Sequence, residues 1–389
     1  MELKKYKLGE ILDVTRGASL SGEFYATEGE YIRLTCGNFD YQNNCFKENK
    51  SKDNLYYTGD FRSEFLMGKG DIITPLTEQA IGLLGSTAII PESGKYIQSQ
   101  DVAKIICKED LLDKDFAFYL ISSTLVKQQL SAAAQQTKIR HTSPDKIKDC
   151  TVWIPELAEQ KRIGKLLRSL DRKIELNRAI NQNLEAMAKQ LYDYWFVQFD
   201  FPNENGKPYK SSGGKMVWNE KLKREIPEGW EVKPINNRLE IKSGFPFKSD
   251  TYKTFGRYKI VTIKNVQDGE LVTSGCDYID ELPSRASDYI SLKTGDRLIS
   301  LTGNCGRLCV VCEENLLLNQ RVGLLYCDAT YLEYFYNFLS SNAMRTVVDN
   351  LANGAAQANL SPVELCKTDC FIPPKDILFM YNDTVQNFV

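Results

Sequence analysis

One pattern of residues occurs twice along the chain, in the same order, and this repeat limits the possible architectures more than any other feature. Tyr31 matches Tyr258, which lies 227 residues later, and Ser143 matches Ser361, which lies 218 residues later. Short insertions and deletions in surface loops produce such a drift in offset. The repeat therefore predicts two domains of one fold rather than a single large core.

Each copy has the composition of a mixed α+β domain. Short segments rich in Ile, Val, Leu and Tyr, separated by Gly and Asn turns, predict strands at 71–75, 87–90 and 102–107, and again at 297–301, 308–312 and 322–327. A helix is expected after them, at 115–134 and 331–351, then a helix start at Ser-Pro and one more short strand. About 150 residues are enough for such a unit to bury its own core.

Residues 156–195, which lie between the copies, predict one long helix. Pro155 precedes it, and no Pro occurs within it. A spacing of four and three residues forms a heptad seam of Ile163, Leu167, Leu170, Ile174, Asn177, Asn181, Leu184, Ala188, Leu191 and Trp195. A rod of roughly 60 Å with such a seam needs a second helix against it, and the seam asparagines would fix the register. A long helix that crosses a globular core is the alternative.

The second copy begins a helix in the same register at about Lys375, with Tyr381 and Val385 at the positions of Ile163 and Leu167. The given sequence holds no counterpart of the following 25 residues or so, and the second helix is thus expected to be truncated. The unpaired half of the first seam, about 174–195, is then an apolar stripe, and we expect self-association through it.

The expected domain boundaries follow from these elements. Residues 1–155 form the first domain, 156–200 the long helix, 201–227 a linker rich in Pro, Gly, Ser and Asn, 228–373 the second domain, and 374–389 the start of the second helix. Trp230 is expected to anchor the second domain against the long helix.

Charge and cysteine content limit the functional classes. The formal net charge of the 389 residues is −2, so nucleic-acid binding would need local patches or a partner. The 11 cysteines show no paired CxxC motifs, and Cys305, Cys309 and Cys312 are expected to be small buried thiols rather than zinc ligands. No signal peptide and no apolar run of 18 residues is found, which indicates a reduced cytoplasmic protein without a membrane span.

The motifs of catalysis are missing from the sequence. We find no Gly-rich loop suited to S-adenosylmethionine, no Asn-Pro-Pro-aromatic motif, no phosphate-binding loop and no carboxylate cluster with a Lys. The single histidine, His141, has no identifiable nucleophile partner. We therefore expect a binding and scaffolding protein with no catalytic residue, no cofactor and no metal.

Four motifs carry a resemblance to a known family: IPELAEQKRI at 154–163, LDRKI at 170–174, YWFVQFDF at 194–201 and IPEGW at 226–230. In this order they strongly resemble the specificity subunits of Type I restriction–modification enzymes, over essentially the whole chain. The resemblance implies two target-recognition domains, each followed by a conserved helix, and each reading one half of a bipartite site in double-stranded DNA. It also implies that the two helices pair antiparallel, and that methyltransferase subunits and ATP-driven restriction subunits assemble on them. The shortened distal helix departs from this pattern.

Two other readings remain open at this point. The chain could be the recognition part of a single-chain methyltransferase or nuclease, although the cofactor motifs are missing. It could also be a non-catalytic coiled-coil adaptor.

Direct readout of DNA needs Arg, Lys, Asn or Gln side chains on loops held by a rigid domain. The best candidate loops are 135–143 and its counterpart 353–361. Both contain Gln or Asn side chains, but only the first contains Lys and Arg. The next candidates are the loops after Gly17 and Gly244, and then the turns at 78–79 and 303–304. The expected DNA-binding residues are Arg33, Gln79, Gln136, Thr137, Lys138, Arg140, His141, Lys248, Lys264, Asn265, Asn304, Gln357 and Asn359. A solvated connector is the alternative for the two loops. If the rod separates the domains, the half-site centres lie at most roughly 17 base pairs apart.

Overall fold

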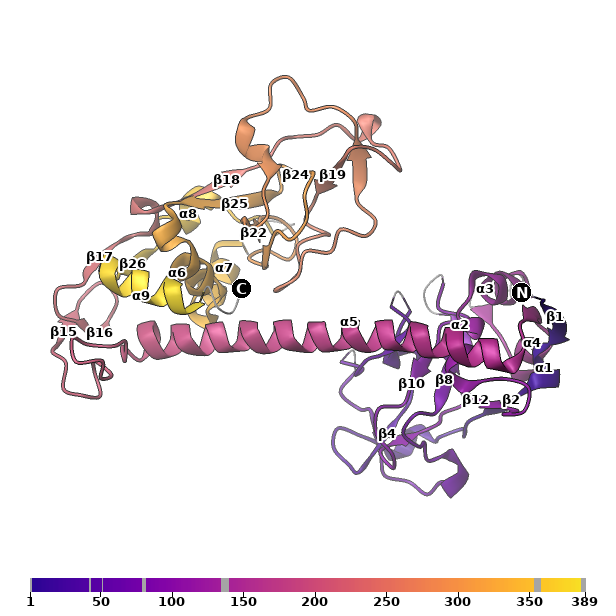
Figure 1. Ribbon diagram of the computed structural model, residues 1–389. Coiled ribbons are helices and arrows are strands. Elements are labelled where there is room, and N and C mark those ends of the chain that lie inside the picture. The colour runs from indigo at the N-terminus through magenta and orange to yellow at the C-terminus, as the bar shows by residue number, and fades with distance from the viewer. Residues whose placement is uncertain are drawn as a thin grey trace. The chain divides into compact units, whose positions relative to one another are not determined.

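The computed structural model of the protein describes residues 2–41, 43–50, 52–78, 82–133, 140–352 and 358–385. The chain divides into two compact units, Met1–Asn177 and Arg178–Val389 (Figure 1). Both units combine small β-sheets with helices, and a long helix, α5, contributes residues to each. This arrangement confirms the expected α+β class with two β-rich domains and a long central helix.

The main sheet of the first unit has four strands in the order β10-β8-β12-β2. The corresponding strands of the second unit, β23-β22-β25-β18, have the same order. The bounds are β2 Leu12–Arg16, β8 Ile72–Pro75, β10 Ala88–Ile89, β12 Val102–Cys107, β18 Leu239–Ser243, β22 Arg297–Ser300, β23 Leu308–Val310 and β25 Val322–Cys327. Register is preserved too, because Arg16 pairs with Ala103 and Ser243 pairs with Gly323 at equivalent positions. The repeat in the sequence is therefore a repeat of topology.

The smaller strand pairs follow the same duplication. β1 (Lys4–Lys7) pairs with β14 (Thr151–Ile154), as β17 (Glu231–Pro234) pairs with β26 (Asp369–Ile372). β4 (Tyr31–Arg33) runs parallel to β11 (Tyr96–Ile97), as β19 (Tyr258–Val261) runs parallel to β24 (Leu316–Leu318). The remaining strands are short: β3 Tyr25–Ala26, β5 Phe39–Asp40, β6 Cys45–Phe46, β7 Tyr56–Tyr57, β9 Thr77–Glu78, β13 Arg140–His141, β20 Asp277–Ile279 and β21 Ser291–Leu292.

The helix expected at 115–134 is in fact two helices, and so is the one expected at 331–351. The bounds are α2 Lys114–Ile121, α3 Thr124–Ala133, α6 Ala329–Ser340 and α7 Asn342–Ala352. Serine side chains cause the break, since Ser123 accepts a hydrogen bond from the Val126 amide (3.4 Å) and Ser341 accepts one from the Met344 amide (3.3 Å). A hydroxyl that satisfies the free amides of a new first turn favours a fresh helix start.

The helices expected at the Ser-Pro steps are present. α4 (Pro144–Lys148) and α8 (Pro362–Leu365) each begin at a proline that follows a serine cap. Ser143 accepts from the Lys146 amide and Ser361 from the Glu364 amide, both at 3.3 Å. α1 covers Leu8–Ile11 and α9 covers Lys375–Val385, so the second copy does start a helix where the sequence predicts it.

The long helix α5 runs without a break over Leu157–Tyr192, 36 residues, and a π-helical turn at Asp193–Val197 follows it. Its first turns are fixed to the first unit by Gln160, which is 1% exposed. The Gln160 side chain accepts from the Asp113 amide (3.0 Å) and donates to the carbonyls of Leu111 (3.1 Å) and Pro155 (2.9 Å). Further along, the Tyr119 hydroxyl donates to Asp171 at 2.5 Å.

The heptad seam of α5 is covered at its ends and open in its middle. Trp195 is 5% exposed, and Ile163, Leu167, Leu184 and Leu191 are half-buried. Leu170 and Ile174 are each 48% exposed, and the seam asparagines, Asn177 and Asn181, are exposed. Further apolar side chains of α5 are exposed beside them: Leu166, Leu176, Ile180 and Met187. The described part of the chain thus leaves this apolar face of α5 uncovered.

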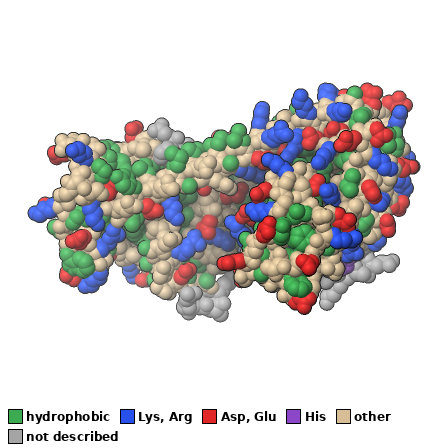
Figure 2. Space-filling model, turned by 90° about the horizontal axis from the view of Figure 1, so that it is seen from below, with side chains coloured by type: hydrophobic (Ala, Val, Ile, Leu, Met, Phe, Trp, Pro, Cys, Tyr) green, Lys and Arg blue, Asp and Glu red, His purple; other side chains and the backbone are tan. Residues whose placement is uncertain are grey.

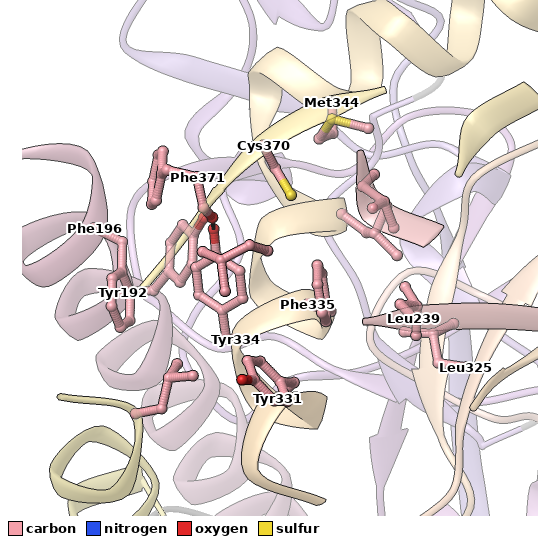
Figure 3. Packing of buried hydrophobic residues seen from close by; sticks show 14 of the residues in the cluster. Tyr192, Phe196, Leu239, Leu325, Tyr331, Tyr334, Phe335, Met344, Cys370 and Phe371 are labelled. Carbon is pink, nitrogen blue, oxygen red and sulfur yellow. Dashed lines mark hydrogen bonds between the residues drawn. The ribbon is translucent and has the colours of Figure 1, made fainter. Parts of the chain in front are cut away.

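The core of the second unit is built where the end of α5 meets α6, α9 and β26. Tyr192, Phe196, Tyr334 and Phe371 pack together there, and the Tyr334 hydroxyl donates to the Phe371 carbonyl at 2.6 Å (Figure 3). Burial raises the pKa of the Tyr192 and Tyr334 hydroxyls well above the usual value for tyrosine. The end of the long helix is therefore an integral part of the second unit.

Residues 201–227, expected to be a linker, contain an ordered hairpin of β15 (Met216–Asn219) and β16 (Arg224–Pro227). Phe201 is 4% exposed and stacks on Trp230, with ring centroids 5.1 Å apart. Trp230 in turn lies 6.3 Å from the Phe196 ring, which confirms its anchoring position next to the long helix. The domain boundaries beyond this remain a prediction.

Candidate nucleic-acid interface

In the first unit, two candidate segments that are far apart in sequence are joined. β9 pairs with β13 in antiparallel register, so that His141 lies opposite Thr77 and Arg140 opposite Glu78. The Thr142 amide donates to the Leu76 carbonyl at 2.8 Å, and the Thr77 hydroxyl lies 3.3 Å from Nδ1 of His141. The turn and the loop predicted as separate sites therefore form one surface.

The second unit repeats this pairing with different side chains. Thr302 and Asn359 form an antiparallel bridge at the positions of Thr77 and His141. The Gly303 amide donates to the Ala358 carbonyl (3.0 Å), and the Leu360 amide donates to the Leu301 carbonyl (2.7 Å). The backbone is thus the same in both units, whereas histidine in one is replaced by asparagine in the other.

The loop after the first strand of each main sheet reaches the same edge. Ala18 bridges to Ser99 in the first unit, and Phe245 bridges to Asn319 in the second. Glycine is required just before each bridge, because a Cβ atom would lie 2.2 Å from the Gln98 carbonyl oxygen at Gly17 and 2.1 Å from the Leu318 carbonyl oxygen at Gly244. These close approaches bring the loops predicted after Gly17 and Gly244 to the edge.

In the second unit the meeting segments enclose an open groove of about 770 Å³. Its lining residues are Ser243, Leu301, Thr302, Gln320, Arg321, Ala358, Asn359, Leu360, Ser361 and Pro362. Gln320 and Arg321 were not among the expected site residues. The signal was present in the repeat, where Gln-Asp-Val at 100–102 becomes Gln-Arg-Val at 320–322. A change of charge inside an otherwise retained motif marks the position.

The polar groups of this groove are available to a ligand. Gln320, Arg321 and Asn359 are exposed, and their side chains make no hydrogen bond or ion pair within the described part of the chain. The Thr302 hydroxyl also has no hydrogen-bond partner there, but it is buried and is therefore not open to a ligand. Free guanidinium and amide groups of this kind are suited to base edges and phosphates.

The expected DNA-binding residues fall into three groups in the structure. Exposed positions are held by His141, Lys248, Lys264, Asn304 and Asn359. Five others lie outside the described residues, and of Arg140 only the backbone is described: the five are Gln79, Gln136, Thr137, Lys138 and Gln357. His141 and Asn359 share the paired edge, whereas Lys248 and Lys264 do not line the groove.

Arg33 and Asn265 differ from the expectation because both side chains are buried, at 7% and 5% exposure. The Arg33 guanidinium donates to the Asn54 carbonyl (3.1 Å) and stacks over the Tyr25 ring. Asn265 accepts from the Thr262 amide (2.8 Å) and donates to the Val272 carbonyl (2.8 Å). Both side chains are therefore engaged in holding the local fold.

Figure 2 shows basic and acidic side chains interspersed on the face it presents, with no broad field of one sign. Several exposed lysines are already paired, such as Lys215 with Glu228 and Lys253 with Asp280, both at 2.5 Å. This pattern agrees with the net charge of −2. A net charge near zero predicts weak electrostatic attraction of DNA by the chain alone.

The described residues contain no group of three or more His, Cys, Asp or Glu side chains that could hold a metal ion. All 11 cysteines are free, and burial raises the pKa of the Cys309 and Cys370 thiols to about 12 each. Thiols of this kind stay protonated and are poor nucleophiles. None of the described helices has the length and apolarity needed to cross a membrane.

Comparison with known proteins identifies relatives. The family model described as the Type I restriction modification DNA specificity domain matches residues 1–186. The MjaIX specificity subunit of Methanocaldococcus jannaschii is 24% identical over 307 residues, which are 74% of this chain and 65% of that protein. The MjaVIII subunit of the same organism is 26% identical over 68% of this chain and 60% of its own length. The matches thus span less than two-thirds of these two relatives.

Similarity also extends to the EcoBI specificity subunit of Escherichia coli, 22% identical over 87% of this chain and 73% of that protein. Among solved structures, the crystal structure of a Type-I restriction-modification system S subunit from M. genitalium superposes with a TM-score of 0.58, at 15% identity, over 100% of this chain and 91% of that one. This likeness concerns the fold. By its sequence matches and its duplicated topology, the chain is similar to the specificity subunits of Type I restriction–modification enzymes.

Proposed function

We propose that the chain is the DNA-recognition and scaffold subunit of a Type I restriction–modification complex, in which each unit reads one half of a bipartite double-stranded site. The observation that carries this proposal is the pair of equivalent edges. One backbone frame presents Thr77 and His141 in the first unit, and Thr302 and Asn359 in the second. Two different half-sites require different side chains on a common frame.

The chemistry belongs to other subunits in this proposal. The chain offers no cofactor motif in its sequence, and its groove is lined by Gln, Arg, Asn and Ser side chains, which bind but do not cleave. Methyltransferase subunits would dock on the helices, with α5 as the main platform because its middle exposes apolar side chains such as Leu170 and Ile174. Restriction subunits would join the same cytoplasmic assembly for cleavage.

Methylation in cells tests the proposal directly. We expect that cells which express the chain with its methyltransferase subunit acquire methylation at one bipartite motif, and that cells with the methyltransferase alone do not. Loss of motif specificity when the chain is omitted is the required control. Methylation that is the same with and without the chain would refute the proposal.

DNA binding in vitro is the second test of the proposed function. Because the net charge is −2, the isolated chain is expected to bind duplex DNA weakly, and binding should tighten when the methyltransferase subunit is added. A mobility-shift titration at fixed salt measures both. Tight, sequence-specific binding by the isolated chain would contradict the scaffold part of the proposal.

A further inference from the structure

The turns at 99–101 and 319–321 are held by the same backbone bonds in the two units. The Asp101 amide donates to the Ser99 hydroxyl (3.4 Å), and the Arg321 amide donates to the Asn319 side chain (3.2 Å). The Asp101 carbonyl accepts from the Leu76 amide (2.8 Å), and the Arg321 carbonyl accepts from the Leu301 amide (3.0 Å). The positions of Asp101 and Arg321 are therefore equivalent, and only their side chains differ.

The two side chains have opposite charge and little to hold them. The Asp101 carboxylate accepts one long hydrogen bond, from the Thr77 hydroxyl at 3.4 Å. Arg321 lines the groove, and its guanidinium has no partner in the described part of the chain. A charged side chain on a fixed backbone, with hydrogen-bonding capacity left for a base edge, has the chemistry of a readout position.

From this geometry we propose that Asp101 and Arg321 are base-reading positions: Arg321 contacts a guanine in the half-site of the second unit, and Asp101 accepts from a cytosine amino group in the half-site of the first. The proposal rests on the DNA-recognition function argued above. Arginine binds O6 and N7 of guanine in the major groove, and carboxylates accept from N4 of cytosine.

A phosphate contact is the competing role for Arg321, and the first unit argues against it. If both units approach DNA in the same way, the position that faces a phosphate in one unit faces a phosphate in the other. The Asp101 carboxylate would then be repelled. Base edges present donors and acceptors alike, so a base-facing position tolerates either charge.

A second position near these turns also differs between the units, because it holds an arginine in the first unit and a serine in the second. Arg16, at the end of β2, donates through Nε to the Gln100 carbonyl at 2.9 Å, and the corresponding residue in the second unit is Ser243. Among the described side chains, the guanidinium of Arg16 is therefore anchored on the backbone in the first unit, whereas that of Arg321 is free in the second. We assign the specific contact to the free one, Arg321.

The test uses the full chain with its methyltransferase subunit and reads the methylated motif by sequencing. We expect the wild-type motif to contain a G·C pair in the second unit's half that Arg321→Gln relaxes, with discrimination at that one position falling roughly 5- to 150-fold. The other half of the motif should stay unchanged. Asp101→Asn should relax one position in the opposite half.

The matched control is Arg285→Gln, since Arg285 is an exposed arginine of the same unit that does not line the groove. This variant should keep the full motif. Salt titrations of DNA binding separate the roles further, because a lost phosphate contact lowers the slope of log K against log salt by about 1, whereas a lost base contact leaves the slope unchanged.

The outcomes are distinct. An unchanged motif in Arg321→Gln, or a uniform loss of affinity with a reduced salt slope, would overturn the assignment of Arg321 while leaving the subunit's function intact. A wild-type complex that methylates no bipartite motif would instead overturn the proposed function, and with it this assignment. Relaxation at a single position of one half supports both.

Discussion

The rings of Trp195 and Tyr381 lie with their centroids 5.7 Å apart, the first in the π-helical turn that follows α5 and the second in the middle of α9. Tyr381 is 0% exposed, and it also contacts Phe196 at 4.9 Å. Both Trp195 and Tyr381 occupy seam positions of the heptad pattern. The seam thus acts as a helix–helix contact within the second unit, where a partner helix is present.

Truncation of Trp195 is expected to destabilise the second unit. Replacing a buried Trp by Ala removes its packing and leaves a cavity, which costs about 3–5 kcal/mol. Hydrogen exchange read peptide by peptide measures the effect on each unit separately. Trp195→Ala should lower protection in peptides of the second unit, whereas Met187→Ala, on the same helix but 47% exposed, should change protection little. Equal effects of the two substitutions would contradict the packing described here.

The sequence predicted the duplication, the long helix and its heptad register because these depend on periodic patterns that few alternatives share. It did not predict the breaks at Ser123 and Ser341, since a serine hydroxyl that caps a new helix differs little in sequence from one within a helix. The Trp195 region was expected to be helical, and the π-helical turn there is fixed by packing of Trp195 and Phe196.

The candidate site was predictable only in part, for a reason of geometry. Polar loops can be recognised by composition, and His141 and Asn359, which were proposed in that way, lie at equivalent paired positions of the two units. The pairing of Thr77 with His141, and the approach of the turn at 319–321, depend on contacts across about 60 and 40 residues that no local pattern encodes. The burial of Arg33 and Asn265 was not predicted, because a cation or an amide in a turn has the same sequence signature whether it is exposed or buried.

The attachment of α5 to the first unit depends on Gln160, and this gives a second stability prediction. Gln160→Leu keeps the volume but leaves the Asp113 amide and the Leu111 and Pro155 carbonyls without their partner. Each buried group left unsatisfied costs about 1–3 kcal/mol. Exchange protection of the first unit should fall. Gln182→Leu, at an exposed position of the same helix, is the control and should leave that protection unchanged.

Self-association through the open face of α5 is expected from the exposure of Leu170 and Ile174, 48% each. Light scattering coupled to gel filtration should show a species larger than the monomer at micromolar concentration. Leu170→Glu combined with Ile174→Glu should shift it to the monomer, because burying two carboxylates in an apolar contact is costly. Arg172→Glu, which adds a carboxylate on the opposite side of the helix, should not. A wild-type chain that is purely monomeric would refute this prediction.

Residues at the two equivalent edges should act on separate halves of the DNA site. Asn359→Ala removes an amide that can bind adenine in bidentate fashion, a contact worth about 1–3 kcal/mol of discrimination, and should relax the motif only in the half read by the second unit. His141→Ala should relax only the other half, because His141 lies at the same backbone position in the first unit. Asn183→Ala, an exposed amide on α5 outside both edges, should leave the motif intact. If either edge substitution altered both halves equally, the two units would not be reading the site independently, and the division of labour between them would have to be abandoned.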